Sequence, residues 1–240
     1  AAPADEIGDL LGSEASDELT GDLSRLDSVR TTRVAAAERY FASHAGDWDR
    51  IRSLHVADSE VEASILRLLG RRPLGKLMDI GTGTGRMLEL LAPRATSAIG
   101  IDRSAEMLRA ARGKLEAAGL GDCPVRQGDM TALPAPDGSA DTVVLHHVLH
   151  FADRPQLAIA EAARVLAPGG RLVIVDFAPH DREELRRDHA HARLGFKDEA
   201  VLGWLAKAGL TTRPPKHFEG PLTVTIWLAE RPPHKLKAVA

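Results

Sequence analysis

Hydrophobic and polar positions follow two different patterns along the chain after Pro73. Short apolar runs rich in Val and Ile alternate with longer stretches whose apolar positions lie three or four residues apart. Runs of the first kind are typical of buried strands, and stretches of the second kind are typical of amphipathic helices. The pattern predicts strands at KLMDI (76–80), TSAIGI (96–101), PVRQ (124–127), DTVVLH (141–146), RLVIVDF (171–177) and LTVTIWLAE (222–230).

Helices are expected between these strands. They fit residues 85–93, 104–119, 154–170 with glycines past the helix end, 182–195 and 197–210. Such alternation is typical of a parallel sheet with helices on both faces. We therefore expect an α/β fold of the Rossmann-like type over residues 73–240.

The first 72 residues have a different texture. Every charged side chain before the first basic residue, Arg25, is acidic. Residues 1–26 thus have little to bury and are expected to form a flexible tail or linker. Helical patterns follow at 27–51 and 58–70, which predicts a helical cap or lid over residues 27–72.

Composition narrows the class of protein. A hydrophobic fraction of 44% and a charged fraction of 27% are ordinary for a globular enzyme. No apolar run approaches the roughly 20 residues that span a bilayer. The net charge of −3 lacks the excess of basic residues that nucleic-acid-binding proteins carry. The single cysteine, Cys123, fits a reducing compartment. We expect a cytoplasmic protein without a membrane or direct nucleic-acid partner.

The stretch LMDIGTGTGRML, residues 77–88, carries the first chemical signal. Gly81, Gly83 and Gly85 allow a tight turn and close backbone approach to a ligand. A dinucleotide-binding loop would place its third glycine at position 86, where this chain has Arg86. Asp79 would repel a pyrophosphate but attract an ammonium. These two departures disfavour a nicotinamide-dependent oxidoreductase.

The ends of the next strands supply what the loop lacks. Asp102 ends the second strand, where an acid can accept both hydroxyls of a ribose. Asp129 ends the third, where a carboxylate can accept from an adenine amino group, and His146 and His147 end the fourth. An ammonium, two ribose hydroxyls, an adenine and no phosphate describe S-adenosylmethionine (SAM).

The chain resembles the class I SAM-dependent methyltransferases over roughly residues 76–230. DIGTGTGR, GIDRSAEML and QGDMTALP look like their first three motifs, and DTVVLHHVLHFADRPQLAIAEAARVLAPGGRLVIVDF looks like their fourth-strand to fifth-strand block. The resemblance implies a reversed last strand, at LTVTIWLAE. It also implies that SAM is the cofactor and S-adenosylhomocysteine the product.

The resemblance further implies a set of cofactor-binding residues. They are Asp79, Gly81, Thr82, Gly83, Gly85, Asp102, Arg103, Gly128, Asp129, Met130, His146 and His147. The glycine loop would meet the methionine part, with Asp79 near its amine and His146 beside it. Asp102 would bind the ribose, Arg103 would lie along the adenine, and residues 129 and 130 would read the adenine edge.

Methyl transfer from a sulfonium is an in-line displacement, so the protein mainly aligns donor and acceptor. An oxygen or nitrogen acceptor also needs a base, for which histidine is suited near neutral pH. The candidates are His146, His147 and His180. Contact with the ligand and ordinary rim packing are both open for the first two, and a solvated loop position also explains His180.

Further residues are candidates for the lid and the acceptor pocket. They are Tyr40, Trp48, His150, Phe151 and Asp176. Ordinary packing also fits His150 and Phe151. His189 and His191 lie two apart on a predicted helix and would face different sides. Because no carboxylate or cysteine completes a recognisable ligand set with them, no metal is expected.

A closer resemblance covers more of the chain. RYFASHAGDWDRIRSLHV, FAPHDREELRRDHAHARLGF and LTVTIWLAE are similar to methyltransferase domains fused behind winged-helix regulators of the arsenical-repressor type. The ubiquinone and menaquinone C-methyltransferases are more distant relatives. A start without Met fits a chain that begins after such a domain, through which it would dimerise. One cysteine cannot hold arsenic, so an arsenic methyltransferase is not expected.

The sequence thus predicts a SAM-dependent methyltransferase with a small-molecule acceptor that the sequence does not identify. The alternative is a sensor module that binds SAM or S-adenosylhomocysteine without catalysis and serves an attached regulator. Direct nucleic-acid methylation is not expected, because LHHVLH lacks the Asn/Asp-Pro-Pro-aromatic motif of the DNA enzymes that methylate amino groups.

Overall fold

A computed structural model describes residues 22, 25, 28, 29, 32, 36–46, 48 and 58–233. The chain divides into two compact units, Ala1–Ala37 and Glu38–Ala240, and the fold and site below belong to the second. Most of the predicted tail, residues 1–26, lies outside the described residues. The predicted boundaries at 26 and 72 stay a prediction.

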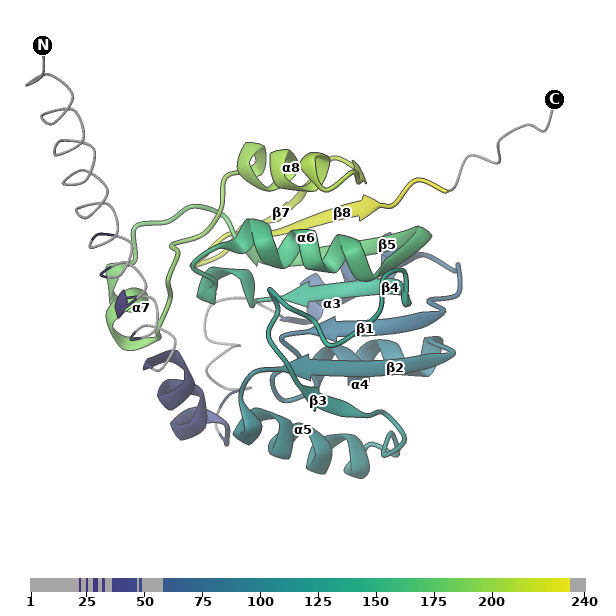
Figure 1. Ribbon diagram of the computed structural model, residues 1–240, viewed down its shortest axis with the longest axis horizontal. Coiled ribbons are helices and arrows are strands. Elements are labelled where there is room, and N and C mark those ends of the chain that lie inside the picture. The colour runs from purple at the N-terminus through teal and green to yellow at the C-terminus, as the bar shows by residue number, and fades with distance from the viewer. Residues whose placement is uncertain are drawn as a thin grey trace, which may run out of the picture. The chain divides into compact units, whose positions relative to one another are not determined.

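In the part of the chain that the structure describes, eight strands form one sheet in the order β3-β2-β1-β4-β5-β8-β6, with β7 paired to β8 (Figure 1). The strands are β1 Lys76–Ile80, β2 Ser97–Asp102, β3 Val125–Gln127, β4 Ala140–His146, β5 Leu166–Phe177, β6 Thr211–Thr212, β7 Lys216–Phe218 and β8 Val224–Glu230. Strands β1 to β5 run parallel, and β8 runs antiparallel to β5. The reversed last strand is therefore confirmed.

Helices cover both faces of this sheet, as Figure 1 shows for α6 in front and for α3 and α4 behind. The helices are α3 Asp58–Leu69, α4 Arg86–Leu91, α5 Ala105–Ala117, α6 Pro155–Val165, α7 Glu183–Asp188 and α8 Asp198–Lys207. Two short 3₁₀ turns, Ala92–Arg94 and Leu149–Phe151, follow α4 and β4. The Rossmann-like α/β fold is confirmed.

The alternation of side chains along the central strands builds two hydrophobic cores. In β4, Val143 and Leu145 join the core under α6 and α8, while Val144 between them joins the core under α3, α4 and α5. In β5, Ile174 and Val175 divide in the same way. Successive strand residues point to opposite faces, so a Val- and Ile-rich run is the pattern that a doubly covered strand requires.

One predicted element boundary is wrong. Residues 154–170 were expected to be helical up to the glycines, but α6 ends at Val165 and β5 begins at Leu166. Pro168 has no backbone N–H for a helix, and Gly169 has a φ of 76°. Leu166 is already in register with Ala140 of β4. Residues 166–170, which periodicity assigns to the helix, therefore belong to strand β5 of the sheet.

The helix predicted over residues 182–195 is also shorter than expected. It is α7, which ends at Asp188, and Ala190 beyond it has a left-handed φ of 57°. His189 and His191 thus lie past the helix end rather than on two of its sides. The short strands β6 and β7 were not expected either. No helix among the described residues has the length and apolar character to cross a membrane.

Candidate functional site

The glycine loop lies between the carboxyl end of β1 and the start of α4. Its backbone is tied to β2, because the N–H groups of Gly81 and Thr82 both donate to the carbonyl of Ile101, at 2.7 and 3.0 Å. A β-carbon on Gly81 would lie 2.2 Å from a methyl of Val148, on the loop after β4. With a φ of 71°, Gly81 therefore meets two constraints that only glycine satisfies.

Asp102 fastens the glycine loop to the end of β2. Its carboxylate accepts from the N–H of Gly83 at 2.8 Å and from the N–H of Ser104 at 2.8 Å. Burial raises the pKa of the Asp102 carboxyl, against the opposing effect of these hydrogen bonds. The carboxylate thus lies at the carboxyl end of β2, beside the loop that follows β1. Its expected contact with a ribose stays a prediction.

Asp129 and Arg103 form the neighbouring part of the site. Asp129 accepts from both the N–H and the hydroxyl of Thr131, each at 2.7 Å, and Arg103 lies 3.6 Å away. Partial burial works to raise the pKa of Asp129, but the Thr131 hydrogen bonds and the Arg103 charge hold it below its usual value. Gly128 and Met130 are half-buried beside it. The expected adenine-reading role of this corner stays a prediction.

The two residues that disfavoured a dinucleotide have clear structural partners. Asp79 is buried under the loop, where it accepts from the Thr82 hydroxyl at 2.6 Å. Its expected contact with a ligand ammonium stays a prediction. Arg86 makes a two-pronged ion pair with Glu62 of α3, at 2.7 Å for both contacts. An arginine at this position therefore anchors α4 to α3.

The loop after β4 brings histidines to the same edge of the sheet. His146, His147 and His150 are all buried, and His147 has a left-handed φ of 50°. His150 Nδ1 lies 2.8 Å from the carboxylate of Asp176, which is 0% exposed at the end of β5. Burial works to raise the pKa of Asp176, but the His150 ring outweighs burial and holds that pKa below its ordinary value.

His147, His150 and Asp176 each offer one ligand-type atom, and these atoms lie within 4.8 Å of one another. The sequence analysis found no carboxylate to complete a ligand set with His189 and His191, and it did not group Asp176 with His147 and His150. Asp176 nevertheless accepts three hydrogen bonds from protein donors: the His150 ring, the His150 N–H and the Phe177 N–H. These bonds occupy the carboxylate, so we interpret the grouping as a hydrogen-bonded pair rather than a metal site.

A lid segment, defined here as residues 38–46 and 48, contacts the site from the N-terminal side. Glu38 pairs with Arg103 at 2.8 Å, and the ring of Phe41 lies 4.8 Å from that of Phe151. The indole N–H of Trp48 lies 3.4 Å from where a β-carbon of Gly83 would be. Trp48 thus lies against the glycine loop and Phe41 against the loop after β4; the expected function of this segment as a lid stays a prediction.

Tyr40 connects the lid to the segment after α7. Its hydroxyl lies 2.7 Å from His189 Nδ1, and burial raises the pKa of the hydroxyl. His191 stacks on His150 with ring centroids 4.1 Å apart. His180 lies 5.9 Å from Phe177 and only half-buried, with a pKa lowered chiefly by burial. His189 and His191, which follow α7, would not be placed at the site by helical periodicity.

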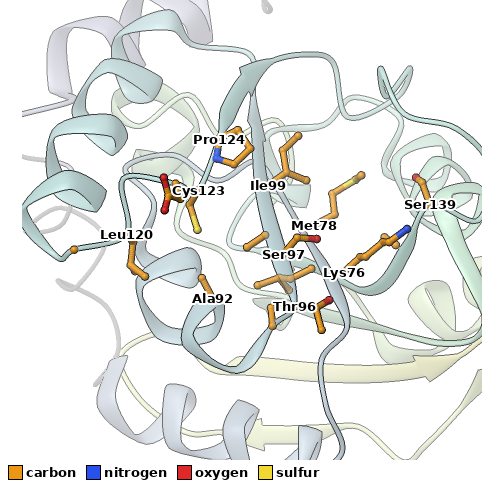
Figure 2. A pocket seen from close by; sticks show the side chains of 16 residues that line it. Lys76, Met78, Ala92, Thr96, Ser97, Ile99, Leu120, Cys123, Pro124 and Ser139 are labelled. Carbon is orange, nitrogen blue, oxygen red and sulfur yellow. The ribbon is translucent and has the colours of Figure 1, made fainter.

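A hollow lies at the opposite edge of the sheet. This pocket of about 490 Å³ is lined by the starts of β1 and β2 and by the loop before β3 (Figure 2). Cys123 lines it beside Pro124, as Figure 2 shows. Burial and the Asp122 charge raise the pKa of this thiol, which keeps it protonated and weakly nucleophilic at neutral pH. Cys123 is thus far from the acids and histidines of the candidate site.

Comparison with known proteins agrees with this geometry. Residues 78–174 match the family model for a methyltransferase domain. A demethylmenaquinone methyltransferase of Thermus thermophilus is 43% identical over 107 residues, which cover 43% of this chain and 48% of the relative. A phosphatidylethanolamine N-methyltransferase of Cereibacter sphaeroides is 38% identical over 132 residues, covering 54% and 63%. The chain thus spans about half to two thirds of these relatives' lengths.

The fold has solved counterparts. A crystal structure of a SAM-dependent methyltransferase from Aquifex aeolicus superposes with a TM-score of 0.58 at 22% identity, covering 70% of this chain and 88% of the other. At this identity the likeness concerns the fold alone. Family model, sheet order and glycine loop agree: residues 78–174 match the methyltransferase-domain family, on a fold shared with solved SAM-dependent methyltransferases.

Proposed function

We propose that the chain transfers a methyl group from SAM to a small, planar acceptor. The observation that carries this proposal is Asp102, whose carboxylate is held by two backbone N–H groups at the rim beside the glycine loop. When bound, SAM supplies an activated methyl group on a sulfonium. The chain's own task is then to hold the donor, align the acceptor and exclude water.

The rings around the site support a planar acceptor. Phe41 packs edge to face against both Trp48 and Phe151, and the rings of Trp48 and Phe151 lie tilted to each other. Aromatic faces of this kind bind flat, apolar ring systems well. The Thermus relative, by its name, methylates demethylmenaquinone, and a quinol-class acceptor would suit the same surface. A phospholipid amine, suggested by the name of the second relative, is the competing class.

Calorimetric titration with SAM, S-adenosylhomocysteine and NAD tests the cofactor. We expect binding of the two adenosyl ligands but not of NAD, and Asp102→Ala should weaken it by roughly 100-fold, because two hydrogen bonds to a charged acceptor are lost. Asp122→Ala is the matched control, since Asp122 is exposed at the opposite edge and should bind normally. NAD binding alone would overturn the proposed cofactor.

Transfer of a tritiated methyl group tests the activity itself. We expect label in 1,4-naphthohydroquinone and none in phosphoethanolamine. Tight SAM binding with no transfer to any acceptor would favour the alternative of a sensor module. No feature of the described residues supports that alternative. The fusion to a winged-helix regulator and the dimer that it would bring stay predictions.

A further inference from the structure

The pairing of His150 with Asp176 fixes the protonation of the imidazole. Asp176 is held ionised, and an ionised carboxylate can only accept hydrogen bonds. The nitrogen that faces it, His150 Nδ1 at 2.8 Å, must therefore carry the proton. The lone pair of the neutral ring then lies on Nε2, which makes Nε2 a proton acceptor.

The backbone holds this ring in place from three directions. The N–H of His150 donates to Asp176 at 3.2 Å, and its carbonyl accepts from Ala192 at 2.9 Å and Arg193 at 3.0 Å. His150 is 3% exposed, and Asp176 is further fixed by the N–H of Phe177. A base oriented by a buried carboxylate through its other ring nitrogen is the arrangement that activates hydroxyl groups in hydrolases.

The pair also lies next to the cofactor loop. Val148, two residues before His150, closes against Gly81, and Phe151, one residue after it, receives the lid rings of Phe41 and Trp48. Other titratable groups face the His150 ring: His147 on its own loop, His180 after β5, and His191 after α7. Asp176 is the carboxylate among the described residues that bonds to it.

We propose that His150 is a catalytic general base for an aromatic hydroxyl acceptor and that Asp176 is its positioning residue. This inference rests on the proposed function. The acceptor O–H proton passes to His150 Nε2, and the acceptor oxygen forms a bond to the methyl carbon. The sulfur–methyl bond breaks with its electron pair going to sulfur. The imidazolium, paired with Asp176, later releases the proton to water.

Two isosteric probes separate the base from a structural role. 2-Naphthol must lose its proton on the enzyme, whereas 2-naphthalenethiol is largely ionised in solution at about pH 8.5. We expect His150→Gln to lower kcat with 2-naphthol by roughly 100-fold or more. Transfer to the thiolate and the affinity for SAM should stay nearly unchanged. His217→Gln is the matched control, because His217 forms an exposed pair with Asp198, at 3.0 Å, on a different part of the sheet.

The pH profile provides a second readout. With 2-naphthol, the dependence of kcat on acid should vanish in His150→Gln. Asp176→Asn should lower kcat with 2-naphthol and leave transfer to the thiolate nearly unchanged, because the imidazolium loses its counter-charge. Equal losses with both probes would overturn the base and leave His150 a structural residue.

The remaining outcomes are also decisive. Nitrogen-15 spectra that place the neutral ring's proton on Nε2 would overturn the base. Activity lost to EDTA and restored by Zn²⁺ would overturn it in favour of a metal. A chain that binds SAM but methylates neither probe would overturn the acceptor class. A chain that fails to bind SAM would instead overturn the proposed function and leave the tautomer of His150 as described.

Discussion

At the scale of single residues, Gly81 offers a clean test of what the cofactor loop requires. Gly81 and Gly119 share almost the same left-handed backbone, with φ of 71° and 72°. A β-carbon on Gly81 would strike Val148, whereas one on Gly119 would meet nothing within 4 Å. The two positions therefore separate backbone strain from steric contact.

We expect Gly119→Ala to cost about 1 kcal/mol of unfolding free energy, from the left-handed backbone alone. Gly81→Ala should cost about 2–5 kcal/mol, because overpacking adds to that strain. It should also weaken SAM binding by displacing the loop after β4. Urea unfolding and calorimetry measure both quantities. Equal costs at the two glycines would contradict the close approach of Gly81 to Val148.

The sequence predicted single site residues unevenly. Asp102 and the glycines could be placed because each directly ends or follows a strand, and the edge where parallel strands end is common to all of them. The partnership of His150 with Asp176 could not, although both also lie at that edge. This partnership depends on the 3₁₀ turn Leu149–Phe151, which directs His150 toward Asp176 at the end of β5. A turn of three residues is too short to give a periodic pattern in the sequence.

At the scale of elements, α3 is fastened to the sheet by a buried arginine. Arg171 at the heart of β5 donates to the carbonyl of Leu69, the last residue of α3, at 2.8 Å and to the carbonyl of Pro73 at 2.9 Å. Arg171 is 5% exposed, and burial lowers its pKa. The bond to Leu69 satisfies a carbonyl that the helix end leaves without an internal partner, and the bond to Pro73 holds the segment between α3 and β1.

Arg171→Met should therefore destabilise the fold by about 2–4 kcal/mol, since the carbonyls would lose charged donors. The lower cost of burying a methionine offsets part of this loss. Arg67→Met on the exposed face of α3 should change the unfolding free energy by less than about 0.5 kcal/mol. Chemical unfolding of both variants measures the difference. A neutral Arg171→Met would show that the guanidinium does not hold α3.

Element boundaries failed where tertiary pairing competes with local periodicity. Strand β1 was predicted to the residue, and β2, β3, β4 and β8 to within one or two residues, because runs such as KLMDI have no helical alternative. The end of α6 was wrong because LAPGG continues an apolar period, and only its pairing with β4 makes it a strand. The two-residue β6 and three-residue β7 carry too few positions for any period to be read.

At the scale of the whole Glu38–Ala240 unit, lid and core perform separable tasks. Phe41 contacts Phe151 and Trp48 but belongs to neither core cluster of the described residues. Phe196, by contrast, is 5% exposed in the core under α6 and α8. Truncating one phenylalanine should therefore affect the retention of the cofactor, and truncating the other should affect the stability of the fold.

We expect Phe41→Ala to speed SAM release by roughly tenfold, since each aromatic pair is worth about 0.5–1.5 kcal/mol and the pairs with Tyr40, Trp48 and Phe151 are lost. The unfolding free energy should change by less than about 1 kcal/mol, because Phe41 is only half-buried. Phe196→Ala should show the reverse, with about 3–5 kcal/mol of stability lost and an unchanged release rate. Stopped-flow displacement and urea unfolding measure the two effects. If Phe41→Ala left release unchanged, the aromatic contacts over the glycine loop would not act as a lid, and cofactor retention would have to come from the loop and Asp102 alone.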